Sequence, residues 1–180
     1  FVPNENNPID ENGHGTHVAS ICCGTGQASD YKFSGVAPKS LILNAKVLNK
    51  NGEGQVDWVI SGIEWAVTNN AQIISMSLGG PRNKPLDDAI RYAIERDIVV
   101  IVAAGNSGSM GWYAIGSPGA VKEAITVGAT YNKDYQGVVF WGQCIDRDPK
   151  KDQIVCFSSR GPTDDLYVKP DVVAPGAKIC

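Results

Sequence analysis

The chain has 180 residues, of which 43% are hydrophobic and 19% charged, and its formal net charge at pH 7 is −3. This length and composition predict a single globular domain, residues 1–180, that can bury a sizeable core. No block of like charge stands out, so nucleic acid and membrane surfaces are not expected partners. The longest apolar run, Ile98–Ala104, is far too short to cross a bilayer, and no signal peptide is visible.

Apolar and amphipathic segments alternate along the first half of the chain. The aliphatic run Leu41–Leu48 predicts a strand. Apolar residues at helical spacing then predict a helix over Val56–Asn69. A second strand is expected at Gln72–Ser77, and a second amphipathic helix at Leu86–Arg96.

The second half of the chain continues the pattern. Ile98–Ala104 predicts a third strand, and because it is apolar on both faces, helices are expected to cover it on both sides. Ala124–Ala129 predicts a fourth strand, while Ile154–Phe157 and Val172–Ala174 are weaker candidates. The alternation of strands and helices predicts a doubly wound α/β fold with a mostly parallel sheet.

Two glycine-rich segments directly follow predicted strands. They are Ser77-Leu78-Gly79-Gly80 and Ala104-Gly105-Asn106-Ser107-Gly108. Open parallel sheets bind ligands outside the carboxyl ends of their strands. The sequence therefore predicts a binding site at this edge of the sheet.

The chain has two histidines, His14 and His17, in the segment Asn12-Gly13-His14-Gly15-Thr16-His17-Val18-Ala19. Three interpretations are open. A metal pair fits poorly, because zinc helices usually space their histidines four apart and no acidic partner segment follows. Both rings could instead serve the structure of a helix start, or one could be a catalytic base, since imidazole exchanges protons near neutral pH.

Asn106 and the glycines of Asn51-Gly52-Glu53-Gly54-Gln55 are ambiguous when taken singly. An Asn between a Gly and a Ser is usually a turn residue. At the end of a strand, however, its amide could also donate to a developing oxyanion. Gly52 and Gly54 could form a tight turn or lie along a bound peptide.

Taken together and in order, these segments resemble the subtilisin-like serine protease family over nearly the whole chain. The resemblance implies an internal fragment of the catalytic domain, with a three-layer α/β fold that is truncated at both ends. The motifs that carry the resemblance are His14-Gly15-Thr16-His17-Val18-Ala19, Gly35-Val36-Ala37-Pro38, Lys46-Val47-Leu48, Gly62-Ile63-Glu64-Trp65-Ala66, Ser75-Met76-Ser77-Leu78-Gly79-Gly80, Ala103-Ala104-Gly105-Asn106-Ser107-Gly108, Phe157-Ser158-Ser159-Arg160-Gly161-Pro162 and Lys169-Pro170-Asp171-Val172-Val173-Ala174-Pro175-Gly176.

The resemblance implies roles for individual residues. His14 matches the general base, His17 a structural position, and Asn106 the side-chain donor of the oxyanion hole. Pro118 matches a proline that is cis in relatives. The residues that match the substrate-binding segments are Gly52 and Gly54 on one edge, Ser77, Leu78 and Gly79 along one wall of the specificity pocket, and Ala103, Ala104 and Gly105 along the other.

Two members of the family's catalytic triad are not found among these residues. The Asp is expected in an Asp-x-Gly motif before the histidine, and Asp10 matches instead a loop carboxylate near the substrate cleft. The nucleophile is expected in a Gly-Thr-Ser-Met-type segment after Gly176. Ser107, Ser158 and Ser159 match structural positions. We therefore expect the 180-residue chain alone to be inactive.

Cysteine and metal sites are less defined. Five cysteines leave at least one unpaired within the chain. Cys22 and Cys23 are expected as buried thiols in a helix, and Cys144 and Cys156 are a candidate disulfide pair. No cofactor is predicted and no metal site is assigned, because the calcium loop of well-known secreted relatives is replaced at Gly24–Tyr31. Calcium binding by a loop in the apparent insertion Trp141–Gln153 stays an alternative, with carboxylates at Asp146, Asp148 and Asp152.

The sequence thus predicts a serine endopeptidase domain that hydrolyses peptide bonds. Its expected partners are a polypeptide substrate and its own propeptide, and secretion is favoured over an intracellular location. The small residues along the pocket walls predict acceptance of large apolar side chains. The alternative is an inactive protease-fold binding module. Another class of α/β hydrolase is disfavoured, because neither a dinucleotide fingerprint nor a P-loop is present.

Overall fold

The computed structural model describes residues 1–3, 5, 8–131 and 153–177. The chain divides into two compact units, Phe1–Ala71 and Gln72–Ile179, and each is described by itself. In the described part of the chain, no helix is long and apolar enough to cross a membrane.

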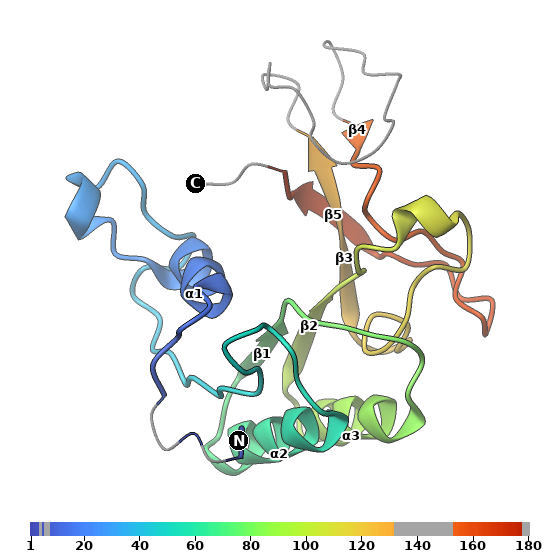
Figure 1. The fold of residues 1–180 in the computed structure, drawn as a ribbon, viewed down its shortest axis with the longest axis horizontal. Helices are drawn as coiled ribbons and strands as arrows, with labels where there is room; N and C mark the ends of the chain where they lie inside the picture. Colours follow the sequence, from blue (N-terminus) through green and yellow to red (C-terminus); the bar gives the residue numbers. More distant parts are fainter. Residues whose placement is uncertain (4, 6–7, 132–152, 178–180) are drawn as a thin grey trace. The chain divides into compact units, whose positions relative to one another are not determined.

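The first unit is built on two helices. Helix α1 covers His14–Cys23, and helix α2 covers Val56–Thr68, with a short 3-10 helix at Gln27–Ser29 between them (Figure 1). The predicted helix over Val56–Asn69 is confirmed. It forms because its apolar stripe has a face to pack: Val59, Ile63 and Ala66 are buried.

The strand predicted at Leu41–Leu48 is wrong. The segment is irregular, and Leu41 is 98% exposed. A strand requires a neighbouring backbone to complete its ladder of hydrogen bonds, and the described residues of Phe1–Ala71 contain no strand. Aliphatic composition alone therefore could not make this segment a strand. It is fixed instead at single points, such as the bond from the Phe1 amino group to the Lys46 carbonyl at 3.0 Å.

In its described residues, the second unit is a mostly parallel sheet with one α-helix (Figure 1). Strands β1, β2, β3 and β5 run parallel in the pairs β1–β2, β2–β3 and β3–β5, while β4 pairs antiparallel with β3. The bounds are Ile73–Met76 for β1, Val99–Ala103 for β2, Ile125–Tyr131 for β3, Gln153–Ile154 for β4, Val172–Pro175 for β5, and Lys84–Ile94 for helix α3; a 3-10 helix covers Gly108–Met110. The predicted α/β class is confirmed, as are the predicted helix and the strands at Gln72–Ser77, Ile98–Ala104, Ala124–Ala129 and Val172–Ala174, apart from small shifts of their ends. The strand predicted at Ile154–Phe157 is wrong beyond Ile154, because the chain turns there and the Ser158 N–H donates to the Val155 carbonyl at 3.1 Å.

Helix α3 covers one face of the sheet. Its start is capped by Asn83, whose side-chain oxygen accepts from the Leu86 N–H at 3.1 Å. Its apolar stripe is packed against β2, since Ile90 is 0% exposed and Val102 of β2 is 1% exposed. The expected helix on the other face of β2 stays a prediction. Val99, on the face opposite to α3, is 45% exposed.

A buried lysine joins the start of β3 to the start of β5. The Lys169 ammonium donates to the Ala124 carbonyl and to Oδ2 of Asp171, both at 2.6 Å, and this oxygen also accepts from the Thr126 N–H at 2.7 Å. Burial raises the pKa of the Asp171 carboxyl, but the bonds from Lys169 and Thr126 outweigh this and hold it below the usual value. The pair fixes β5 beside β3.

Candidate active site

His14 is the first residue of helix α1, and a carboxylate organises the start of this helix. Oδ1 of Asp10 accepts from the N–H groups of Asn12 at 3.0 Å and Gly13 at 2.8 Å. Oδ2 accepts from both the N–H and the hydroxyl of Thr16, each at 2.8 Å. These bonds satisfy amide groups that a helix start leaves unpaired, and the negative charge lies at the positive end of the helix.

The hydrogen bonds of this cap change the acidity of Asp10. The bonds from Gly13 and then Thr16 hold the pKa of the Asp10 carboxyl far below its usual range. The sequence-based interpretation assigned Asp10 only to a loop near the substrate cleft and missed this cap. The usual signal places the capping residue directly before the helix, whereas Asp10 lies three residues before Gly13, so the pattern could not have revealed it.

A second contact joins the histidine segment to the predicted edge segment. The Asn12 amide donates to the Lys50 carbonyl at 3.1 Å. Gly52, in the left-handed region at φ 78°, lies beside Asn12: a β-carbon at Gly52 would be 3.5 Å from the Asn12 amide nitrogen. Gly52 is therefore brought next to the start of α1.

Gly54 is required by close packing. A β-carbon there would be 2.5 Å from the Val47 carbonyl oxygen and 2.7 Å from a methyl group of Leu48. In the described residues Gly52 and Gly54 belong to no strand, and both are exposed.

His14 and His17 both lie on α1 and both are exposed. The backbone N–H of His14 donates to the Asn12 side-chain oxygen at 3.4 Å, and the backbone N–H of His17 donates to the Gly13 carbonyl at 3.0 Å. Within the described residues, no group of three or more His, Cys, Asp or Glu side chains could hold a metal ion. Asp146, Asp148 and Asp152, the alternative calcium ligands, lie outside them.

In the second unit, the two predicted pocket walls leave the same edge of the sheet. Strands β1 and β2 are parallel neighbours with Met76 opposite Val102. The segments that continue them, residues 77–79 and 103–105, therefore run side by side. Ser77 and Gly79 are exposed, Leu78, Ala103 and Gly105 are half-buried, and Ala104 is 3% exposed.

A third segment contacts both walls, and sequence reasoning did not assign it to the pocket. The Gly80 N–H donates to the Ser117 carbonyl at 2.9 Å, and a β-carbon at Gly119 would be 2.8 Å from the Ala103 carbonyl oxygen. A β-carbon at Gly116 would overlap the Gly80 carbonyl oxygen. The sequence signal that could have revealed this contact is the pair of glycines, Gly116 and Gly119, around Pro118. The Ser117–Pro118 peptide bond is cis, as predicted.

Asn106 lies on the loop that follows β2. Its residue is exposed, and the described residues offer its side-chain amide no hydrogen-bond partner. The preceding Gly105 has φ 102°, a conformation that side chains rarely adopt. The loop thus presents a free amide at the carboxyl edge of the sheet, beside the two wall segments.

The internal serines do not resemble nucleophiles. Ser158 and Ser159 are each 2% exposed, and each hydroxyl accepts a backbone N–H. A peptide could not reach them without unfolding the segment.

Cys22 is exposed and Cys23 half-buried, so the expected burial of Cys22 is wrong. The reason is that the described helix α1 buries none of its residues. Cys156 is disulfide-bonded, and its expected partner Cys144 lies outside the described residues.

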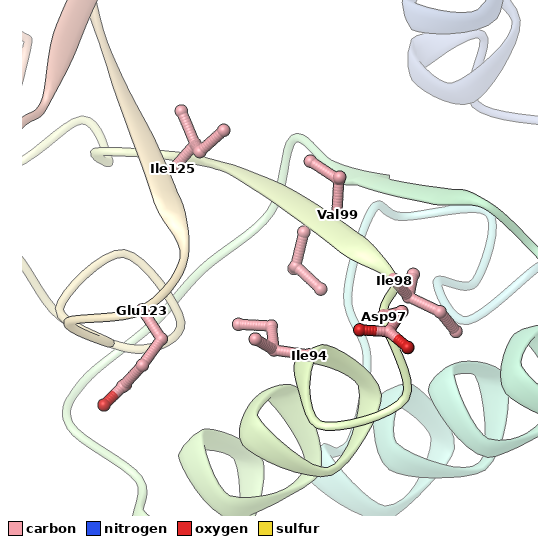
Figure 2. Close-up of a pocket in the computed structure, with 7 residues that line it drawn as sticks. Ile94, Asp97, Ile98, Val99, Glu123 and Ile125 are labelled. Atoms are coloured by element: carbon pink, nitrogen blue, oxygen red, sulfur yellow. The ribbon is translucent and has the colours of Figure 1, made fainter.

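A separate pocket of about 330 Å³ lies at the other end of the strands (Figure 2). It is formed where α3 ends and where β2 and β3 begin, and two carboxylates contribute to its apolar lining. The lining residues are Ile94, Asp97, Ile98, Val99, Val100, Glu123 and Ile125. Because ligands of parallel sheets bind at the carboxyl ends of the strands, this pocket is not the predicted site.

The second unit therefore has the organisation of an α/β enzyme. A parallel sheet ends in glycine-rich segments, and one of them presents an exposed amide. The sequence model of the subtilase family matches residues 2–179. The chain belongs to the subtilase family.

Relatives and solved structures agree with this assignment. The chain is 38% identical to serine protease AprX of Bacillus subtilis over an alignment of 193 residues, which covers 99% of this chain and 41% of the relative. It is 38% identical to a subtilisin of Bacillus pumilus over an alignment of 182 residues, which covers 99% of this chain and 57% of the relative. The structure of sphericase matches with a TM-score of 0.74 at 32% identity, covering 93% of this chain and 54% of that one. The chain thus spans about half the length of the relatives it matches.

Proposed function

We propose that this chain is part of a single serine endopeptidase domain, with His14 as the general base and Asn106 as the side-chain donor of the oxyanion hole. The observation that carries the proposal is the Asn106 loop at the carboxyl edge of the sheet, with its amide unpaired. Family membership and the names of the relatives, which are serine proteases, support the reaction class.

The proposed chemistry assigns one role to each residue. A serine hydroxyl attacks the scissile carbonyl carbon, His14 takes the hydroxyl proton and later returns it to the leaving amine, and an aspartate orients the imidazole. The Asn106 amide donates to the oxygen that becomes negative in the tetrahedral intermediate. The serine and aspartate of the triad are not assigned to residues of this chain.

The substrate is an extended polypeptide. The residues proposed to bind its backbone are Gly52 and Gly54 and also residues 77–79, which form one wall of the specificity pocket. Ala103, Ala104 and Gly105 would form the opposite wall of a pocket for a large apolar side chain. In a precursor, its own propeptide would occupy the same segments. We further propose that the protein is secreted and needs no cofactor. Calcium binding, the alternative, is tested by direct measurement.

The test compares peptide hydrolysis by the full-length gene product with that of two variants. His14→Ala is expected to remove nearly all turnover. Asn106→Ala is expected to lower kcat by roughly 10²–10³-fold with little change in KM, which is the loss known for the oxyanion asparagine of subtilisin itself, a relative of this chain. Peptide binding without turnover in the unmodified protein would contradict the proposal and indicate an inactive binding module.

A further inference from the structure

One buried serine, Ser159, forms two hydrogen bonds with the loop that carries Asn106. Ser159 is 2% exposed and lies 53 positions further along the chain than Asn106 (159 − 106). Its backbone N–H donates to the Gly105 carbonyl at 2.9 Å. Its hydroxyl oxygen accepts from the Ser107 N–H at 3.0 Å. The residues directly before and after Asn106 are therefore bonded to the same partner.

Packing leaves this loop little freedom around Ser159. A β-carbon at Gly105 would lie 2.9 Å from the Ser159 hydroxyl oxygen. On the other side of the loop, the Gly108 N–H donates to the Phe157 carbonyl at 2.9 Å, and a β-carbon at Gly108 would overlap the carbonyl oxygens of Cys156 and Ser158. The loop thus lies directly on the backbone of residues 156–159.

We propose that Ser159 is a positioning residue for the oxyanion hole: its hydroxyl and backbone N–H fix the direction in which the Asn106 amide points. The inference rests on the proposed role of Asn106. Ser159 would not touch the substrate. It would act by limiting the rotation of the two peptide groups on either side of Asn106, because a donor stabilises an oxyanion only if it is already aimed at it.

The chain offers a matched control in the adjacent residue. Ser158 is also 2% exposed, and its hydroxyl also accepts one backbone N–H, from Ala129 of β3 at 3.0 Å. Replacing either serine by alanine removes the same atom from the same buried segment. Of the two serine hydroxyls, only that of Ser159 bonds to the Asn106 loop.

The experiment measures peptide hydrolysis by the full-length gene product and its variants. For Ser159→Ala we expect kcat to fall about 10-fold, with KM changed less than about threefold, because a misplaced donor weakens transition-state binding more than substrate binding. Ser158→Ala is expected to keep kcat within about twofold. A similar fall of kcat for both serines would overturn the proposal, since it would show a general effect of disturbing the segment.

A double variant separates positioning from other effects. In the Asn106→Ala background there is no amide left to position, so adding Ser159→Ala should change kcat less than about twofold. If the two losses simply multiply, Ser159 does not act through Asn106 and the inference fails. If Asn106→Ala alone leaves kcat unchanged, it is the proposed function of Asn106 that fails.

A second substitution covers the case in which Ser159→Ala does not fold. Ser159→Cys keeps a side chain of the same connectivity, while sulfur is a much weaker hydrogen-bond acceptor. It should lower kcat in the same direction and again have little further effect in the Asn106→Ala background. Unchanged kcat in a folded Ser159→Cys protein would count against the proposal.

Discussion

The two segments proposed to carry catalytic residues are held in opposite ways. His14 lies on an exposed helix start that is organised by a charged side chain, with Asp10 accepting four hydrogen bonds from the segment. Asn106 lies on a loop that is organised by a neutral, buried serine and by tight backbone packing. The His14 segment depends on a charged group and on hydrogen bonds exposed to water. The Asn106 loop depends on close packing that leaves no room for further atoms.

This difference suits the chemistry proposed for each residue. A general base has to accept and release a proton, and a helix start close to solvent leaves its ring accessible. An oxyanion donor has to keep one direction, because stabilisation by a fixed dipole is lost when the dipole must first reorient. The contrast leads to different expected responses to added volume, to pH and to the loss of a single hydrogen bond.

The largest expected effect comes from adding one methyl group to the Asn106 loop. A β-carbon at Gly108 would overlap backbone carbonyl oxygens, so Gly108→Ala should lower the free energy of unfolding by about 3 kcal/mol or more. At Gly13, beside His14, φ is 93° but nothing lies within 4 Å, so Gly13→Ala should cost only about 1–2 kcal/mol of backbone strain. Urea unfolding of the full-length gene product measures both, and equal costs would remove the contrast in packing.

An intermediate effect is expected from Asp10→Asn, and it should depend on pH. The folded pKa of Asp10 is lowered, so its stabilisation is complete above the unfolded value of about 3.9 and is lost as the pH falls towards the folded value. The Tm of the unmodified protein should therefore exceed that of Asp10→Asn at pH 7, and the difference should shrink at pH 3. Glu11→Gln is the control, because Glu11 accepts none of the cap's hydrogen bonds. A difference in Tm that is the same at both pH values would show that the charge of Asp10 is not what matters.

The smallest effect is expected from the contact between the histidine segment and the turn at Gly52. Asn12→Ala removes the hydrogen bond to the Lys50 carbonyl and the longer one from the His14 backbone N–H. Both are exposed, so the free energy of unfolding should fall by only about 0.5–1 kcal/mol. Chemical denaturation measures it, with Asn51→Ala as the control, since the Asn51 side chain forms no such link. A loss as large as that of Gly108→Ala would mean that the histidine segment is also held by packing.

Local pattern was sufficient for most of the elements. Helical spacing predicted α2 and α3, and runs of aliphatic residues predicted β1, β2 and β3, because each signal comes from residues adjacent in sequence. The same reasoning failed at Leu41–Leu48, where composition favoured a strand but no neighbouring strand is present among the described residues of that unit. A strand forms only when a second segment pairs with it through backbone hydrogen bonds. The sequence of one segment does not show whether such a partner lies beside it.

The sequence by itself determined the family and the mostly parallel sheet, and it led to the proposal of His14 and Asn106, because motif order and strand ends can be read along the chain. Only the tertiary structure decided what holds these residues. Asp10 caps a helix from outside the usual position, and Ser159 reaches the Asn106 loop across 53 positions of sequence (159 − 106). The Ser159 contact joins residues far apart in the sequence, and the Asp10 contact depends on the path of the chain just before the helix. The usual spacing patterns encode neither.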